Sequence, residues 1–146
     1  MILNFRKINE NAITPVRGTE YSAGLDLCAD IDKETVTIEP NETLMVGTGV
    51  CVEIPDGYFG AVFARSGIAF KRGLRPANCV GVIDSDYRGE IKVALHNDSA
   101  LPQTIANGER IAQLVITPYV KVELKEVDIL NDSDRGAGGF GSTGRK

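Results

Sequence analysis

Alternating apolar and polar residues are the dominant pattern along this chain. Thr35–Glu39 and Val120–Lys125 alternate with a period of two, which is typical of strands with one buried face. Between these segments lie runs rich in β-branched, aromatic and other apolar residues: Leu44–Ile54, Tyr58–Phe63, Glu90–His96 and Ile111–Val115. The pattern therefore predicts a succession of short strands.

Turn-forming residues separate the predicted strands. Pro55-Asp56-Gly57 and Asn107-Gly108 are examples, since Pro presets a turn angle and Gly and Asn tolerate left-handed backbone. The sequence predicts one helix only, a turn or two around Ser66–Arg72. Short strands at this spacing indicate an all-β domain of the sandwich or barrel type.

The composition is that of an ordinary globular domain. The chain has 146 residues, of which 42% are hydrophobic and 25% charged, so one domain is expected. Its net charge of −4 argues against broad binding to nucleic acid or to an anionic membrane, either of which requires a basic face. Apolar runs fall far short of the roughly 20 residues that span a bilayer, and the first residues do not resemble a signal peptide. We therefore expect a cytoplasmic location.

Cysteine and histidine limit the chemistry that is available. Cys28, Cys51 and Cys79 are widely spaced and form no C-x-x-C pair, so we expect three small core residues and neither a disulfide nor a zinc site. His96 is the only histidine, and it falls on the polar side of its predicted strand, as an ordinary surface histidine would. Catalysis would have to depend on carboxylates, arginines or a metal ion.

An anion-binding segment is predicted where the helix begins. Ser66 is a candidate N-cap, and the free N–H groups of a first helical turn attract anions. Arg65 beside it could bind a phosphate group through two parallel hydrogen bonds. The alternative is a capping serine next to a solvated arginine.

Carboxylates mark two further segments. Gly81–Glu90 is typical of strand, tight turn and strand, where Asp84 either bonds to nearby backbone or acts as a general base at the edge of a pocket. Tyr87 in the same turn could form an aromatic wall. Asp26 lies between apolar residues and must find hydrogen-bond donors or a cation.

The fourth and fifth segments can also be explained without a ligand. In Gly108–Leu114, Arg110 could bridge carboxylates in the core, and Gln113 could satisfy backbone groups. The glycine-rich end, Arg135–Lys146, is either a disordered tail or a flap that becomes ordered over a ligand. An anionic aromatic ligand would use its Arg, Phe, Ser and Thr side chains and its backbone N–H groups.

Five segments taken together point to a family. They are Ala23-Gly24-Leu25-Asp26-Leu27, Arg65-Ser66-Gly67-Ile68-Ala69, Gly81 to Glu90, Gly108 to Leu114, and Arg135 to Gly144. In sequence and in order they resemble the five motifs of the trimeric dUTPase family. Two positions depart from the usual pattern, Ala64 in place of a frequent proline and Ile68 in place of leucine, and neither affects a group that takes part in the reaction.

The resemblance implies a fold, an assembly and a reaction. The fold is an all-β, jelly-roll-like (β-clip) domain with at most one short helix, in a homotrimer whose active sites are shared between subunits. Residues 1–130 would form the β-domain, and residues 131–146 a polar linker with a C-terminal flap that closes an active site. The reaction is hydrolysis of dUTP to dUMP and pyrophosphate by water attack on the α-phosphorus, with Mg²⁺ on the triphosphate. This reaction keeps uracil out of DNA and supplies dUMP for dTMP synthesis.

The resemblance also assigns roles to individual residues. Asp84 would orient and deprotonate the attacking water, and Asp26 would be an outer-shell partner of Mg²⁺ through water. The residues that would bind the phosphate chain are Arg65, Ser66, Gly67, Gln113, Arg135, Ser142 and Thr143. The residues that would hold the nucleoside are Asn78, Val82, Ile83, Tyr87, Lys92, Phe140 and Gly141. Among these, Tyr87 would pack beneath the deoxyribose and exclude a 2′-hydroxyl, and Phe140 would stack on the uracil ring.

Two other functions compete with this one. A dCTP deaminase shares the architecture but needs a glutamate that activates water against cytosine, and it lacks the glycine-rich Phe-Gly-Ser-Thr ending. A trimer that binds nucleotide without hydrolysing it is the second alternative. The intact Asp26, Asp84 and Arg135 argue against that loss of activity.

Overall fold

Strands form nearly all of the regular structure. The computed structural model describes residues 1–139, and its strands and helix, in chain order, are β1 Asn4–Lys7, β2 Val16–Arg17, β3 Leu25–Cys28, β4 Thr35–Ile38, β5 Thr43–Gly47, β6 Val50–Glu53, β7 Tyr58–Phe63, α1 Ser66–Arg72, β8 Leu74–Pro76, β9 Val80–Ile83, β10 Lys92–Asn97, β11 Gln103–Ala106 and β12 Arg110–Pro118. The prediction of an all-β fold with one short helix is confirmed.

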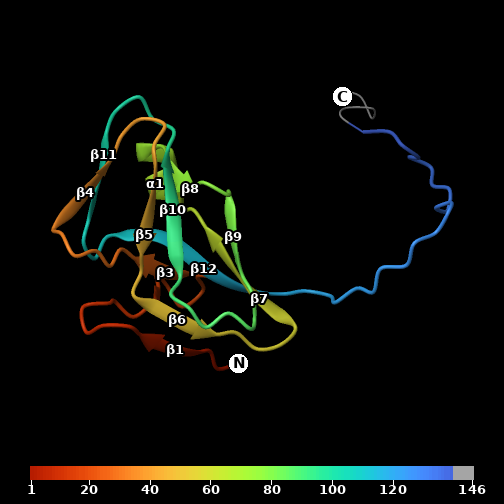
Figure 1. Ribbon diagram of the computed structural model, residues 1–146, viewed down its shortest axis with the longest axis horizontal. Coiled ribbons are helices and arrows are strands. Elements are labelled where there is room, and N and C mark those ends of the chain that lie inside the picture. The colour runs from red at the N-terminus through yellow and green to blue at the C-terminus, as the bar shows by residue number, and fades with distance from the viewer. Residues whose placement is uncertain (140–146) are drawn as a thin grey trace.

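The strands pair into four antiparallel sheets. A five-stranded sheet has the order β2-β3-β12-β7-β9, and a three-stranded sheet has the order β5-β10-β8. Two-stranded sheets join β1 to β6 and β4 to β11. The sheets gather into one body, and the chain leaves that body after β12 (Figure 1).

The core lies between the inner faces of these sheets. Leu27, Leu114 and Leu95, from three different strands, are fully buried and belong to one hydrophobic cluster. Burying such a side chain contributes roughly 1.5–3 kcal/mol, so the cluster supplies most of the driving force for folding. Asn97 is also fully buried, and its amide donates to the carbonyls of Ile38 and Leu101 at 2.9 Å each, which satisfies the polar group.

One predicted strand is divided in two. Leu44–Ile54 is interrupted at Thr48 and Gly49, between β5 and β6. Gly49 has a φ of +65°, which breaks the extended backbone, and the Thr48 hydroxyl donates to the Ile91 carbonyl at 2.7 Å. The chain changes sheets at this point.

The predicted strand Val120–Lys125 is wrong. After Pro118, the described residues contain no helix or strand, and Val120, Val122 and Leu124 are 82%, 73% and 92% exposed. A strand forms only where a neighbouring strand completes its hydrogen bonds, and the body offers this segment no partner. We name residues 119–139 the C-terminal arm (Figure 1).

The cysteines differ in environment. Cys28 and Cys51 are buried as expected, but Cys79 is exposed, so the prediction of three core cysteines is wrong for Cys79. Burial raises the pKa of the Cys28 thiol, and the neighbouring Asp26 charge adds to the increase. A raised pKa lowers the thiolate fraction at a given pH and slows alkylation.

Iodoacetamide is therefore expected to label one thiol per native chain, at Cys79, at about pH 8. Cys28 and Cys51 should react only after the chain is unfolded in urea, because both are buried. Mass spectrometry of tryptic peptides measures the order in which the three thiols are labelled. Labelling of Cys28 at the rate of Cys79 would contradict the difference in burial.

No helix in the described part of the chain has both the length and the apolar character needed to cross a membrane.

Candidate active site

Two hollows contain most of the predicted site residues. The first, the arginine pocket, has a volume of about 200 Å³ and is lined by Gly18, Ser22, Gly24, Asp26, Arg65, Ser66, Gly67, Arg110 and Gln113. The second, the β9–β10 pocket, has a volume of about 190 Å³ and is lined by Met45, Val62, Pro76, Asn78, Gly81, Val82, Ile83, Lys92, Val93 and Ala94. The two linings have no residue in common.

A buried carboxylate organises the arginine pocket. Asp26 on β3 is 8% exposed, and it accepts hydrogen bonds from Arg65 Nε at 2.8 Å and from Arg110 Nη1 at 3.1 Å. The expected need of Asp26 for donors is thus confirmed. Two guanidinium groups against one carboxylate leave the pocket with a positive charge, which suits an anionic ligand.

The start of α1 forms one wall of this pocket. Arg65 occupies the N-cap position with extended backbone, and no side chain caps the helix, so the prediction of Ser66 as N-cap is wrong. The first backbone bond of the helix runs from Ala69 N to Arg65 O at 3.0 Å. The preceding N–H groups, those of Ser66 and Gly67 included, therefore have no partner within the helix and add to the attraction for an anion.

Gln113 fixes the opposite wall. Its amide donates to the Ala64 carbonyl at 2.9 Å, one of the two roles expected from the sequence. A Cβ on Gly24 would lie 2.6 Å from Gln113 Oε1 and 3.1 Å from Gln113 Cβ, so a larger residue just before β3 would displace the Gln113 side chain. The pocket wall depends on this contact.

The sequence interpretation missed the loop that precedes β3. Gly18 and Ser22 line the arginine pocket, and the loop is held by Arg17, whose guanidinium donates to the Ala23 carbonyl at 2.9 Å and to the Ser22 carbonyl. The mostly small and polar residues of segment 18–24 were the available signal, since such residues allow a ligand to approach the backbone.

The β9–β10 pocket lies between two sheets. The segment from Gly81 to Glu90 was expected to form strand, tight turn and strand, but β9 pairs with β7 whereas β10 pairs with β5 and β8. The expected hairpin is therefore not a hydrogen-bonded pair. Both edges of β10 are already occupied, which leaves a hollow between β9 and β10.

The turn after β9 contains two predicted residues. Asp84 is exposed and follows Ile83 of the pocket wall, and its carbonyl accepts from Tyr87 N at 3.2 Å. Tyr87 is 45% exposed, and its hydroxyl donates to the Glu90 carbonyl at 3.0 Å. No described residue bonds to the Asp84 carboxylate within hydrogen-bond distance, so its oxygens are open to a hydrogen bond from a bound water.

Lys92 lines the β9–β10 pocket from β10, where its Nζ lies 3.4 Å from Glu90 Oε2. Lys92 also borders a larger hollow of about 490 Å³ whose lining includes Asp30 and Asp32. It is the one sequence-predicted residue in that hollow.

The oxygen donors of the arginine pocket suit a metal ion that is bound mainly by phosphate groups of a ligand. Among residues 1–139, no three His, Cys, Asp or Glu side chains come together as a metal site would require. Mg²⁺ commonly keeps several waters and is held by one or two carboxylates together with phosphate groups. Asp26 is the only carboxylate in the arginine pocket, and its oxygens have lone pairs left for a metal-bound water.

The remaining predicted residues lie in or beyond the C-terminal arm. Arg135 is exposed, and its Nε donates to the Gly138 carbonyl at 2.8 Å within the arm. The structure does not bring Arg135 to either pocket of its own chain. Phe140, Gly141, Ser142 and Thr143 lie outside the described residues.

Comparisons with known proteins agree on one family. A model of the dUTPase family matches residues 10–144. The deoxyuridine 5′-triphosphate nucleotidohydrolase of Nautilia profundicola is 49% identical over 145 residues, which cover 99% of this chain and 100% of that protein.

Solved structures agree as well. A variant dUTPase of Staphylococcus bacteriophage 80alpha with dUpNHpp has a TM-score of 0.89 and 33% identity, and the match covers 98% of each chain. A variant dUTPase from phage phi11 of S. aureus, whose structure reveals the coordination of a structural Mg(II) ion, has a TM-score of 0.79 and 32% identity, covering 88% of this chain and 98% of that one.

Proposed function

This chain belongs to the dUTPase family, and we propose how its residues carry out the hydrolysis of dUTP to dUMP and pyrophosphate. The observation that carries the proposal is the arginine pocket, where Arg65 and Arg110 share one buried carboxylate beside the open start of α1. A triphosphate is the ligand that such a pocket suits, since guanidinium and backbone N–H groups both bind phosphate oxygens.

The site is completed by other copies of the chain, in a homotrimer. Each pocket, at about 200 and 190 Å³, is smaller than the roughly 300–1,000 Å³ of typical ligand sites, and the two linings share no residue. One pocket is polar and the other largely apolar, as expected if each takes one part of a nucleotide. Contact between copies would bring both parts together.

The C-terminal arm supports the same assembly. Val120, Val122 and Leu124 alternate with polar residues and are exposed on the single chain, and in a strand they would share one face. Pairing with a strand of a neighbouring subunit would bury them and would carry Arg135 to a site on that neighbour. This accounts for a strand-like pattern that forms no strand within its own chain.

Asp84 orients and deprotonates the water that attacks the α-phosphorus. The basicity of a carboxylate is modest, so alignment of the water and neutralisation of phosphate charge contribute more than proton abstraction. Arg65, Ser66 and Gly67 bind the phosphate chain together with Gln113. Arg135, from the arm of another subunit, neutralises the terminal phosphate.

Mg²⁺ is the cofactor that this set of residues fits. The triphosphate and water would hold most of its coordination sphere, with Asp26 accepting a hydrogen bond from a coordinated water. When bound, the ion neutralises phosphate charge. The two arginines keep Asp26 in a fixed orientation for that contact.

The β9–β10 pocket binds the nucleoside. Backbone groups from Asn78 to Ile83 can pair with the edge of uracil, and Val82 and Ile83 supply apolar contact. A tight fit there excludes the 5-methyl group of thymine. Lys92 lines the same pocket, and Phe140, next to Gly141, stacks on the base, a contact typically worth roughly 1–3 kcal/mol.

Tyr87→Ala is expected to admit UTP as a substrate. The Tyr87 hydroxyl bonds to the Glu90 carbonyl, which holds the tyrosine ring in place. We expect the ring to pack beneath the deoxyribose, where it leaves no space for a 2′-hydroxyl. Steady-state rates with dUTP and UTP, for the wild type and for Tyr87→Phe as a control, measure the change. Continued rejection of UTP by Tyr87→Ala would remove Tyr87 as the sugar filter.

Pyrophosphate release with Mg²⁺ from dUTP, dTTP, dCTP and UTP, measured side by side, tests the proposed function. Release from dUTP alone, with dUMP as the second product, is the expected result. Ammonia from dCTP would indicate a deaminase. Binding of dUTP without release would indicate a nucleotide-binding trimer that has lost hydrolysis, and equal rates on all four would contradict the base and sugar recognition.

A further inference from the structure

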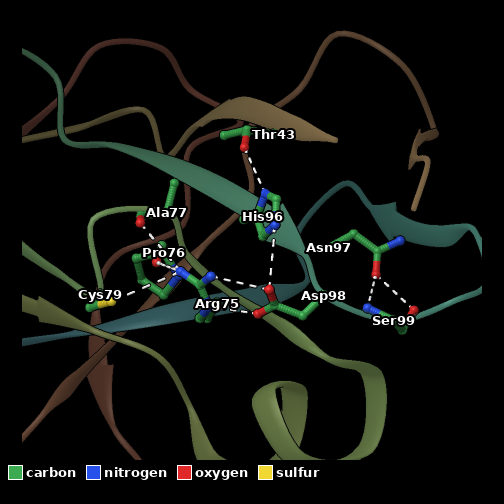
Figure 2. Close-up of polar contacts among 9 residues, drawn as sticks. All are labelled: Thr43, Arg75, Pro76, Ala77, Cys79, His96, Asn97, Asp98 and Ser99. Atoms are coloured by element: carbon green, nitrogen blue, oxygen red, sulfur yellow. Dashed lines mark hydrogen bonds and ion pairs between the residues drawn. The ribbon is translucent and has the colours of Figure 1, made fainter. Parts of the chain in front are cut away.

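Arg75 contacts the turn that brings Asn78 to the β9–β10 pocket. We call residues 76–79 the Asn78 turn. From β8, Arg75 Nη1 donates to the carbonyls of Pro76 at 3.2 Å and Ala77 at 3.3 Å, and it lies 3.9 Å from Cys79 Sγ (Figure 2). One side chain thus contacts three of the four residues of this turn.

The Asn78 turn has a backbone that depends on such contacts. Cys79 N donates to the Pro76 carbonyl at 2.9 Å, and Val80 N donates to the Asn78 carbonyl at 2.7 Å. Cys79 has a φ of +63°, in the left-handed region that residues other than glycine rarely adopt. Its own sequence therefore does not strongly favour this turn, and outside contacts must stabilise it.

Asp98 holds the guanidinium in place. Arg75 Nε lies 2.6 Å from Asp98 Oδ2 and Arg75 Nη2 lies 3.1 Å from Oδ1, a two-point contact that fixes the guanidinium plane (Figure 2). The Arg75 hydrogen bond lowers the pKa of Asp98, so the carboxylate is ionised at neutral pH.

His96 connects this pair to the sheet. It lies opposite Arg75 across β8 and β10, its Nδ1 is 2.9 Å from the Thr43 hydroxyl, and its Nε2 is 3.4 Å from Asp98 Oδ1 (Figure 2). The side chain is 22% exposed, so the histidine is partly covered on the polar side of its strand. The polar contacts that run from Thr43 through His96 and Asp98 to Arg75 therefore connect strands β5, β10 and β8 to the Asn78 turn.

Stability alone does not account for this arrangement. The side chains of Arg75 and Asp98 are 36% and 45% exposed, and exposed ion pairs contribute little to the free energy of folding. The pair orients the Arg75 guanidinium relative to the turn. The guanidinium bonds to Asp98 on one side and to two carbonyls of the Asn78 turn on the other.

We propose that Arg75, held by Asp98, is a positioning residue that fixes the Asn78 turn for recognition of the nucleobase. The proposal rests on the assignment of the β9–β10 pocket to the nucleoside. Arg75 itself need not touch the substrate, and it lines neither pocket. Its effect is on the geometry with which Asn78 and the following backbone meet the base.

Arg75→Ala in the full-length chain is the first test. We expect KM for dUTP to rise about tenfold and kcat to change less than about twofold, since the lost bonds support base binding and not the phosphate groups. The preference for dUTP over dCTP should fall as well. Arg75→Lys should give an intermediate KM, because one ammonium cannot reach Asp98 and both carbonyls together.

Arg72→Ala is the matched control. This arginine also bonds to a carboxylate and a carbonyl, those of Glu109 and Thr104, but it lies at the end of α1 remote from Ser66. We expect Arg72→Ala to lower Tm about as much as Arg75→Ala does, and to leave KM for dUTP unchanged. An equal rise in KM for both variants would indicate a general loss of structure and would overturn the proposal.

The exchanged pair Arg75→Asp with Asp98→Arg separates positioning from ion pairing. It restores opposite charges but turns a carboxylate toward the carbonyls of Pro76 and Ala77, so KM should remain raised. Full recovery of KM would show that the ion pair alone matters and would overturn the proposal. So would a changed molecular mass of Arg75→Ala in light scattering, which would indicate a role in assembly.

Failure of the proposed function has a different signature. If the wild-type chain releases no pyrophosphate from dUTP, the function itself is wrong. If the wild type is active and Arg75→Ala has the wild-type KM and selectivity, only the positioning role is wrong.

Discussion

Asp84→Asn is expected to lower kcat for dUTP by about 10²–10⁴-fold while dUTP binding and assembly remain intact, because an amide cannot take the proton of the attacking water. The residue lies in an exposed turn, and its carboxylate bonds to no described residue within hydrogen-bond distance. The substitution therefore removes no contact that stabilises the fold. Steady-state rates, calorimetric titration with dUpNHpp, an analogue of dUTP, and light scattering give the three readouts.

Asp86→Asn is the control for Asp84→Asn. Asp86 is exposed in the same turn and is a carboxylate of the same size, but no role in the reaction is assigned to it. Its kcat should stay close to that of the wild type. Wild-type turnover in Asp84→Asn, or an equal loss in both variants, would refute the assignment of Asp84 as the base.

Deleting residues 136–146 is expected to leave the fold intact and to lower kcat/KM by about 10²-fold or more. The deletion removes the donors of Ser142 and Thr143 and the stacking of Phe140, and loss of a single transition-state donor commonly costs 10²–10³-fold. The core cluster has no member after Ile116, so Tm should not change. Circular dichroism and pyrophosphate release measure the two effects.

Mixed assemblies test whether the tail acts on another subunit. Tail-deleted chains are unfolded and refolded together with full-length Asp84→Asn chains, each of which is expected to have little activity alone. If sites are shared, some mixed sites combine an intact Asp84 with a tail from the other chain, and activity returns. No recovery in an assembly shown by mass to be mixed would mean that each tail serves its own chain. Full activity of the deleted chain by itself would contradict the flap.

Some elements could be predicted from local pattern because local chemistry decides them. The predicted bounds of Tyr58–Phe63 and Ser66–Arg72 coincide with β7 and α1. The β-forming run of β7 begins directly after Gly57, and the helix-compatible run of α1 ends at Gly73, so turn residues mark a boundary of each element. Strands of two to four residues, such as β2 and β8, are too short for a period to be recognised.

Some residues of the candidate site could be predicted from the sequence and others could not. Arg65, Asp26 and Gln113 were all selected from the sequence, and the structure brings them into one pocket, since motifs on β3, α1 and β12 converge there. The roles of Gly18 and Ser22, and the network around Arg75, were missed. Both depend on hydrogen bonds from an arginine side chain to backbone carbonyls, and the pattern of apolar and polar residues does not reveal such bonds.

The amino-acid sequence by itself determined the fold class, the family and the chemical types of the functional groups, because periodicity and motif order are properties of the chain alone. Only the tertiary structure decided which strands pair. It separated β9 from β10, left Val120–Lys125 without a partner, and turned Arg75 toward the Asn78 turn. Pairing and side-chain orientation depend on residues far apart in the sequence, and the free energy that selects them comes from burial and hydrogen bonds that exist only once the chain has folded.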